Sequence, residues 1–531
     1  MLTARQARRG MAVAPHHLAA EAGLRVLREG GGAVEAMVAM GAAIAVVYPH
    51  MTGIGGDGFW LIDAPGWKTP VAIDACGRAA RLADIAFYRR RGHTTIPTRG
   101  PLAANTVAGA ISGWQAALKL AKAKLGARLP LKRLLDDAIH WAEQGAPATA
   151  SQGNYTARFL AELAPQPGFA QALLDQGRPP AAGTMRRMPE LAKTLRQLAR
   201  RGLDDFYRGE LATAMAAEHE RLGGPLRAAD FRAHKAALVK PLSVALRAGT
   251  VFNLPPPTQG VSSLTILGLF ERLGVAEAEG FDFVHGLVEA TKQAFLWRNR
   301  HVADPKVMTA DPRAELTAEA LDRSAARIDR RRALPWPQPA AKGDTVWMTA
   351  ADARGTVVSY IQSVYWEFGS GVVLNDSGVM WQNRGASFQL DPQAVNALAP
   401  GRKPFHTLNP ALARLQDGRV MAYGTMGGEG QPQTQAMIFT RHVSYGQELQ
   451  RAVTAPRWLL GRTWGQETTT LKLERRFPES LFGALGAAGH DVEWLPEWSD
   501  FVGHAHALVR HADGRLEGAT DPRADGAAAG F

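Results

Sequence analysis

The sequence predicts a mixed α/β (α+β) fold in which two β-sheets pack on each other and helices cover their outer faces. Helical and strand patterns alternate along the chain in separated runs that carry layers of apolar residues, as in packed-layer architectures. The 531 residues, of which 46% are hydrophobic, exceed the usual size of a single domain. They nevertheless provide enough apolar material for one large shared core.

The first elements along the chain are two helices and two strands. Residues 18–27 have the spacing of a helix, which ends at the glycines 30–32, and residues 33–47 form a second, strongly apolar helix. Residues 59–62 and 71–73 are short apolar runs that predict strands. We expect both helices to be buried.

Further helices and strands are predicted along the rest of the chain. Residues 251–254 predict a strand that runs into the prolines 255–257. Later in the chain, a strand at residues 420–423 precedes a helix that begins near Gln433. Helical spacing is present in four other segments, residues 114–125, 130–143, 189–201 and 281–299.

A β-hairpin is predicted directly after an exposed connector. The connector, residues 330–343, carries three prolines and no apolar periodicity. Residues 345–349 and 356–364 are rich in β-branched and aromatic side chains, and residues 352–355 form the turn between them.

The tripeptide Gly343-Asp344-Thr345 stands where the connector meets the hairpin. If the Asp344–Thr345 bond is cut, Thr345 gains a free α-amino group beside its own hydroxyl, which is the arrangement of an N-terminal-threonine nucleophile. Folding the hairpin places Thr345 across from Gln362 or Ser363, although a shift of one residue would turn it to the other face. From these residues alone, an ordinary linker followed by an ordinary hairpin is the alternative.

Several ordered motifs resemble those of γ-glutamyltranspeptidases. Residues 343–388 contain GDT, GTVVSYIQS, FGSGVV and SGVMWQNRG, and this segment is similar to the start of the small subunit in that family. The usual EGGNAVDA motif reads EGGGAVEA at residues 29–36. The chain is more similar to the branch without a signal peptide, which includes glutathione-hydrolase-like proteins and an oxamate amidohydrolase. The other matching segments are APHHLA at 14–19, GIGGDGF at 53–59, the prolines 255–257 and GTMGG at 424–428.

The resemblance implies the four-layer αββα sandwich of N-terminal-nucleophile hydrolases. It also implies autocleavage between Asp344 and Thr345, which gives a large chain of residues 1–344 and a small chain of residues 345–531 that share one core. In the precursor, Thr345 Oγ would attack the Asp344 carbonyl. In the mature enzyme the α-amino group, whose ordinary pKa is roughly 7.7–8.0, would accept the hydroxyl proton before Oγ attacks a substrate amide.

Four residues are expected to carry the catalysis. They are Thr345, Ser363, Gly427 and Gly428. The glycines lie between a strand and a helix, where their N–H groups could stabilise an oxyanion near a positive helix end, and the family assigns the matching pair to that role. Ser363 matches a threonine that hydrogen-bonds the nucleophile in the family. The alternatives are an ordinary Gly-Gly turn and a strand hydroxyl bonded to backbone.

The expected substrate-binding residues depart from the family pattern. Arg384 and Ser387 stand where a glutamine and an aspartate bind the α-amino group of the glutamyl donor, and a guanidinium would instead bind a carboxylate. His406 and Thr407 match the family's carboxylate-binding Ser-Ser pair. Arg78 lies near its carboxylate-binding arginine, with a small gap in register. Each arginine could also be a solvated surface residue.

Tyr365 falls where the family usually has an asparagine, which weakens the transfer of that asparagine's role to this chain.

These observations predict an autoprocessing amidohydrolase that acts on a small acidic amide, with a γ-glutamyl compound such as glutathione as the default donor. Oxamate or a glutaryl-type monoamide without an α-amino group is the alternative donor and suits Arg384 and Ser387 better. Hydrolysis is favoured over transfer to an amine because no acceptor site is evident. The remaining alternative is an uncleaved, non-enzymatic binding protein. No metal or cofactor is required, and no metal-ligand spacing such as HExxH is present.

Composition bounds the other classes of function. The net charge of +12 is spread over many segments without a nucleic-acid-binding motif, so it suits attraction of small anions better than binding of nucleic acid. The single cysteine, Cys76, excludes an internal disulfide and is most simply a buried small apolar residue. The N-terminal sequence lacks the pattern of a signal peptide, and no apolar run approaches 18 residues. We therefore expect a cytoplasmic protein without a membrane span; a homo-oligomer is compatible with the sequence.

Overall fold

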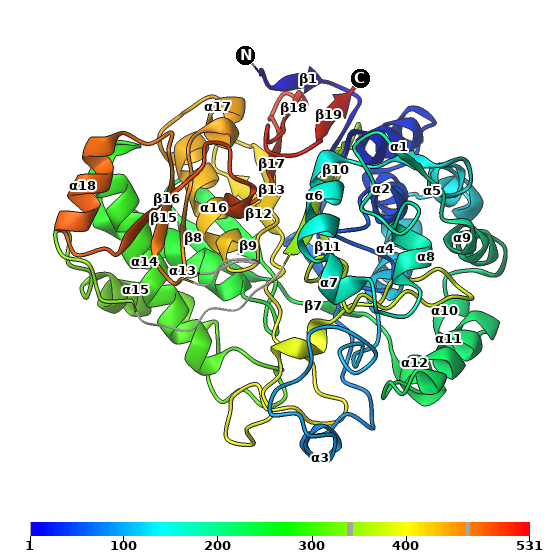
Figure 1. Cartoon of the computed structure of the whole chain (residues 1–531). Coiled ribbons are helices and arrows are strands. Elements are labelled where there is room, and N and C mark those ends of the chain that lie inside the picture. Colours follow the sequence, from blue (N-terminus) through cyan, green and yellow to red (C-terminus); the bar gives the residue numbers. More distant parts are fainter. Residues whose placement is uncertain (1, 337–343, 462–467) are drawn as a thin grey trace.

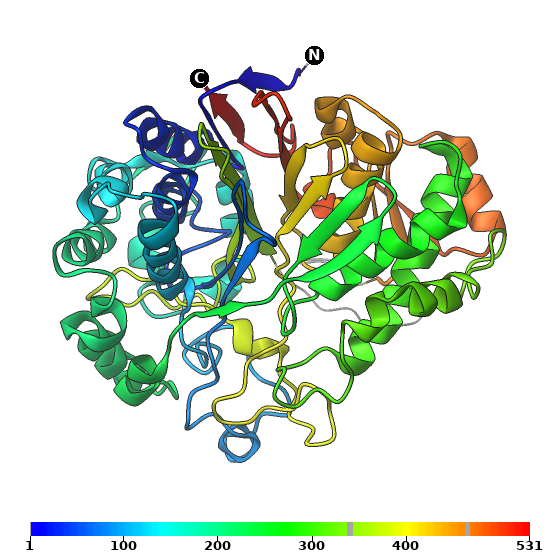
Figure 2. The ribbon, with the colours of Figure 1, turned by 180° about the vertical axis from the view of Figure 1, so that it is seen from behind.

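Two seven-stranded sheets pack face to face, and helices cover both outer faces (Figures 1 and 2). The computed structural model describes residues 2–336, 344–461 and 468–531. Residues 337–343 of the predicted connector lie outside the described residues. They include Gly343, the first residue of the predicted cleavage motif. The predicted four-layer αββα sandwich is confirmed.

The first sheet contains the predicted hairpin at its centre, and all its neighbouring strands run antiparallel. The strands β10 and β11 form the hairpin, between β2 on one side and β3 on the other. In spatial order the strands are β19 (Ala527–Gly530), β2 (Gly10–Ala14), β10 (Asp344–Asp352), β11 (Val357–Tyr365), β3 (Asp57–Asp63), β4 (Val71–Ala75) and β7 (Ala237–Val239).

The second sheet is also antiparallel. Like the first, it combines strands from both sides of Thr345, because β1, β8 and β9 precede this residue and the others follow it. In spatial order its strands are β1 (Arg5–Ala7), β18 (Leu516–Ala519), β17 (Ala505–Arg510), β13 (Val420–Thr425), β12 (Ala411–Leu415), β9 (Gly249–Asn253) and β8 (Leu242–Leu246).

The helices form two outer layers (Figure 1). On the first sheet, α1, α2 and α4 contact the strands. Helix α1 also packs on α2, α5 packs on α2, and α9 packs on α5. On the second sheet, α13 and α16 contact the strands and α14 packs on both. The bounds are α1 (His17–Arg28), α2 (Ala33–Val47), α4 (Ala110–Lys124), α5 (Leu131–Gln144), α9 (Pro189–Arg201), α13 (Gly260–Leu273), α14 (Gly280–His301) and α16 (Gly430–Phe439).

Seven of these helices match predicted segments, although α4 begins four residues and α16 three residues before the predicted start, and α13 was not predicted. Both N-terminal helices bury residues as expected, and every residue of α2 is buried. Among the described residues, none of the helices has both the length and the apolar character that crossing a bilayer would need.

The hairpin strands are apolar on both faces because each face meets a core. Trp347 and Ile361 point into the core between the sheets, whereas Val346 and Tyr360 belong to the core beneath α2 and α4. This alternation follows from the two-residue period of a strand. A Cβ at Gly424 would lie 2.5 Å from the Trp347 ring, so a glycine is required there for the two sheets to approach this closely.

Candidate active site

Thr345 lies at the start of the central strand β10 and is 1% exposed. The ladder pairs Asp344 with Tyr365 and Val346 with Gln362, and the register shifts between them. Thr345 therefore lies opposite Ser363 and the residue after it, at a β-bulge, in agreement with the predicted hairpin. Bulges redirect a side chain out of the regular pleat, which suits a nucleophile at the end of a buried strand.

The N-terminus of α16 points at Thr345. Gln431 lies in the first turn of this helix, and its Nε2 donates a hydrogen bond to Thr345 Oγ1 at 3.3 Å. Gly427 and Gly428 directly precede the helix, with positive φ values of 112° and 53°. Within the described chain neither glycine N–H donates to a protein acceptor. Two N–H groups beside a helix N-terminus and a hydroxyl can stabilise an oxyanion formed at that hydroxyl.

A buried glutamine holds the glycine loop against the predicted substrate site. Gln259 Nε2 donates to the carbonyl oxygens of Gly428 and Thr407, at 2.9 and 2.7 Å. Gln259 Oε1 accepts a hydrogen bond from Arg298 Nη1 at 2.8 Å, and the other guanidinium nitrogen pairs with Glu429. The sequence analysis did not identify Gln259 or Arg298, because their partners are distant along the chain.

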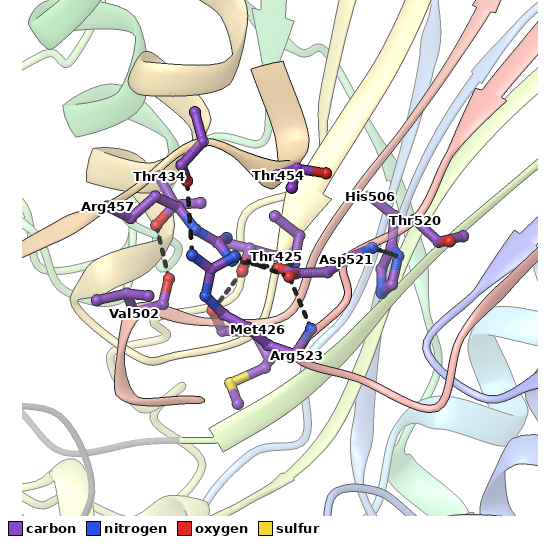
Figure 3. Close-up of polar contacts among 12 residues, drawn as sticks. Thr425, Met426, Thr434, Thr454, Arg457, Val502, His506, Thr520, Asp521 and Arg523 are labelled. Carbon is purple, nitrogen blue, oxygen red and sulfur yellow. Dashed lines mark hydrogen bonds and ion pairs between the residues drawn. The ribbon is translucent and has the colours of Figure 1, made fainter. Parts of the chain in front are cut away.

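A buried ion cluster supports the strand end that leads into this loop (Figure 3). Arg457 and Arg523 both pair with Asp521, and the side chains of all three are fully buried. Burial raises the pKa of Asp521, but the two guanidinium groups outweigh this effect and hold it below its ordinary value. Asp521 also accepts a hydrogen bond at 2.7 Å from the amide of Ala505, which pairs with Thr425 at the end of β13.

Arg384 is fully buried and forms no ion pair with a carboxylate in the described chain, although the nearby Asp57 attracts its charge. Its Nη1 reaches Thr407 Oγ1 at 3.4 Å, and its Cζ lies 3.9 Å from the centroid of the Tyr365 ring. Nε and Nη2 have no hydrogen-bond partner among the described residues. Burial lowers the pKa of Arg384 to about 10, so it remains charged at neutral pH. A buried, unpaired cation is costly, and an anionic ligand would relieve this cost.

His406 lies beside Arg384 and is bound to a carboxylate that the sequence analysis did not single out. Its Nε2 lies 2.9 Å from Asp57 Oδ2, and Asp57 Oδ1 accepts the amides of Gly77 and Gly109, both at 2.9 Å. Burial raises the pKa of Asp57 to about 7. Burial, and then the charge of Arg384, lower the pKa of His406 well below its ordinary value, so the ring is neutral and donates Nε2–H to Asp57.

The two remaining predicted substrate residues differ in their surroundings. Ser387 donates a hydrogen bond to the carbonyl oxygen of Phe405 at 3.1 Å. Because Phe405 directly precedes His406, this contact places Ser387 next to the segment that carries His406. Arg78 contacts Asp304 at 3.4 Å and the carbonyl oxygen of Gly401 at 3.1 Å, and it lines a separate surface pocket of about 570 Å³. None of these contacts joins Arg78 to Arg384. Its role as an anion ligand stays a prediction.

Cys76 lies close enough to Asp57 and His406 for the three to be considered as metal ligands. The donor set does not fit one. Burial raises the pKa of the Cys76 thiol well above its ordinary value, whereas a metal binds the thiolate. Asp57 and His406 are also already bound to each other.

Comparisons with known proteins agree with this architecture. A family model described as gamma-glutamyltranspeptidase matches residues 19–531. The oxamate amidohydrolase proenzyme of Klebsiella pneumoniae is 56% identical over 522 residues, covering 98% of both chains. The glutathione hydrolase-like YwrD proenzyme of Bacillus subtilis is 38% identical, again covering 98% of both. The crystal structure of a cephalosporin acylase from Bacillus halodurans superimposes with a TM-score of 0.91 at 31% identity, covering 100% of this chain and 97% of that one.

The fold and the relatives define an autoprocessing amidohydrolase of the N-terminal-nucleophile class. Within that class, the chain belongs to the γ-glutamyltranspeptidase family. The resemblance drawn from the sequence motifs is thereby confirmed.

The buried guanidinium of Arg384 predicts that small carboxylates stabilise the protein. With about 10 mM oxalate or glutarate and a Kd near 0.1 mM, binding would contribute about 2.7 kcal/mol, which differential scanning fluorimetry would detect as a rise in apparent Tm. Arg384→Met should remove the rise and Arg78→Met should leave it. A shift that survives in Arg384→Met but is lost in Arg78→Met would assign the carboxylate to Arg78 instead.

Proposed function

We propose that this protein cuts itself between Asp344 and Thr345 and then hydrolyses the amide of a small carboxylate that carries no α-amino group, with oxamate as the first candidate. The observation that carries this proposal is the buried guanidinium of Arg384, two of whose nitrogens have no partner among the described residues. A carboxylate can accept from these nitrogens as a bidentate ligand.

The same charge argues against a γ-glutamyl donor. An ammonium group about 4 Å from the guanidinium would be repelled by roughly 4 kcal/mol at an effective dielectric constant near 20. The Tyr365 ring lies 3.9 Å from Arg384 Cζ and takes up space beside it, which favours a short donor. Oxamate carries its carboxylate on the carbon next to the amide, and the name of the 56% identical relative agrees with this choice.

The proposed chemistry uses one hydroxyl twice. In the precursor, Thr345 Oγ attacks the Asp344 carbonyl, the acyl group moves from nitrogen to oxygen, and water hydrolyses the ester. In the two-chain enzyme, the freed α-amino group takes the hydroxyl proton as Oγ attacks the donor amide. The N–H groups of Gly427 and Gly428 stabilise the oxyanion, and the Gln431 side chain orients Oγ. The amine leaves with the proton, and water then hydrolyses the acyl-enzyme.

A γ-glutamyl compound such as glutathione is the second candidate donor. It is favoured by the glutathione hydrolase-like relative at 38% identity. A cytoplasmic location is part of the proposal, since a single cysteine suits a reducing compartment.

Self-cleavage predicts two chains in the purified protein. Intact-mass spectrometry should find one chain that begins at Thr345, and Thr345→Ala should remain a single chain because it lacks the attacking hydroxyl. An active wild-type protein that stays in one piece would reject the mechanism.

The donor is tested by comparing kcat/KM for oxamate, a glutaryl amide and glutathione. We expect oxamate to be preferred. The double variant Arg384→Gln, Ser387→Asp removes the guanidinium and adds a carboxylate, so the site would accept an ammonium group. It should lower oxamate hydrolysis by at least about tenfold and gain γ-glutamyl hydrolysis. If the double variant gains no γ-glutamyl activity at all, these positions do not select the donor.

The oxyanion role predicts that Gly427→Ala lowers kcat by about 10²–10³-fold. An added Cβ would meet only the backbone of Gly503, with Cα at 3.5 Å and N at 3.8 Å, so the effect would come from the backbone leaving φ = 112° and turning the N–H away. Gly446→Ala is the matched control, since Gly446 also has positive φ (66°) but lies in open space. It should keep full activity per processed molecule. Equal losses in both variants would point to general destabilisation instead.

A further inference from the structure

A buried polar cluster outside the active site binds the chain segment that leads toward Thr345. Glu289 and Lys292 lie one turn apart on α14, are each 1% exposed, and form an ion pair of 2.7 Å. The same pair holds both backbone polar groups of Leu334. Lys292 Nζ donates to the Leu334 carbonyl at 2.6 Å, and the Leu334 amide donates to Glu289 Oε2 at 3.2 Å.

Two histidines extend this contact. His285 Nε2 lies 2.8 Å from the carbonyl oxygen of Asp329, and His285 Nδ1 lies 2.8 Å from His490 Nε2. The Ala333 amide donates to the carbonyl of Ala488 at 2.8 Å. The segment 329–334 is therefore bound by α14, which precedes Thr345, and by the loop of Ala488 and His490, which follows it.

The cluster does not fit a metal ion, although His285, Glu289 and His490 offer three ligand atoms close together. The ammonium group of Lys292 already donates to Glu289 and lies 3.4 Å from His490 Nδ1, so a cation occupies the centre of the group. Burial lowers the pKa of His490 to about 3 and keeps it neutral. Lys292 is therefore the positive partner of Glu289.

Burying the Glu289–Lys292 ion pair costs desolvation free energy, which indicates a role beyond stabilising the fold. Replacing a buried ion pair by apolar side chains of similar volume is often neutral or stabilising. Apolar side chains, however, could not hold the N–H and C=O groups of Leu334. Asp344 follows Leu334 by ten positions, which allows a reach of roughly 35 Å at most. A fixed Leu334 thus limits where the connector can place the bond to be cut.

We infer that Glu289 and Lys292 form a clamp that positions the connector for self-cleavage and keeps the end of the large chain bound to both chains afterwards. This inference rests on the proposed cleavage at Asp344–Thr345. The two residues act through the backbone of Leu334 and are positioning residues, since nothing in the structure brings them to Thr345.

The test compares two double variants with the same chemistry and the same spacing. Glu289→Leu with Lys292→Met removes the clamp, and Glu190→Leu with Lys193→Met removes an exposed i,i+3 pair on α9. After cell-free synthesis of the full chain, mass spectrometry follows conversion to two chains. We expect the clamp variant to convert at least about tenfold more slowly at a similar apparent Tm, and the α9 variant to match the wild type. Conversion of a folded clamp variant at the wild-type rate would overturn the positioning role.

Hydrogen exchange provides a second measurement that does not require a variant of the clamp. The amides of Ala333 and Leu334 should be protected in the uncut Thr345→Ala protein and in the mature wild type. Rapid exchange in the mature enzyme would show that the end of the large chain is not retained, and rapid exchange in both would reject the clamp even if its double variant failed to fold. A wild type that is never cut, with protected amides in Thr345→Ala, would instead refute the proposed function and leave the clamp as a purely structural contact.

Discussion

The placement of Thr345 in the middle of a buried sheet is the constraint on which the rest of the site depends. β10 lies between β2 and β11, and its side chains alternate between two cores. Because the strand is held along its length, Thr345 has a defined position whether or not the Asp344–Thr345 bond is intact. The N-terminus of α16 and the two glycines before it are then aligned on that position by β13, which lies in the facing sheet.

Electrostatics divides the site into parts with different tasks. Around Gly427 and Gly428 the charges that hold the backbone are paired, as in Arg298 with Glu429 and Arg457 with Asp521. Arg384 forms no ion pair among the described residues, although Asp57 attracts its charge, and two of its nitrogens have no hydrogen-bond partner there. Burying a charge without an ion-pair partner costs free energy, and a bound anion would offset part of that cost. This contrast separates the paired charges that support the backbone from the guanidinium to which the proposed function assigns donor selection.

Much of the fold could be predicted because its central elements have strong local patterns. The apolar helix α2, the hairpin β10–β11 and the turn between them follow from periodicity and turn residues, and the sequence motifs indicated the αββα architecture. The glycine pair before α16 was visible as a motif. Gln259 and Arg298 were not, and Asp57 stood in the motif GIGGDGF without an assigned role, because these residues act through partners between about 40 and 350 positions away. Short strands such as β1 and β19 also carry too few residues for a periodic signal.

The interleaving of strands in both sheets has a consequence for the lifetime of the enzyme. As a single chain the protein can fold in a unimolecular reaction. Once the backbone is cut, each of the two chains lacks strands that complete its sheets. Refolding after unfolding then becomes a second-order association of two incomplete chains whose exposed strand edges favour aggregation. The lifetime of the processed form is then set by its rate of unfolding, and each molecule folds only once, as the precursor.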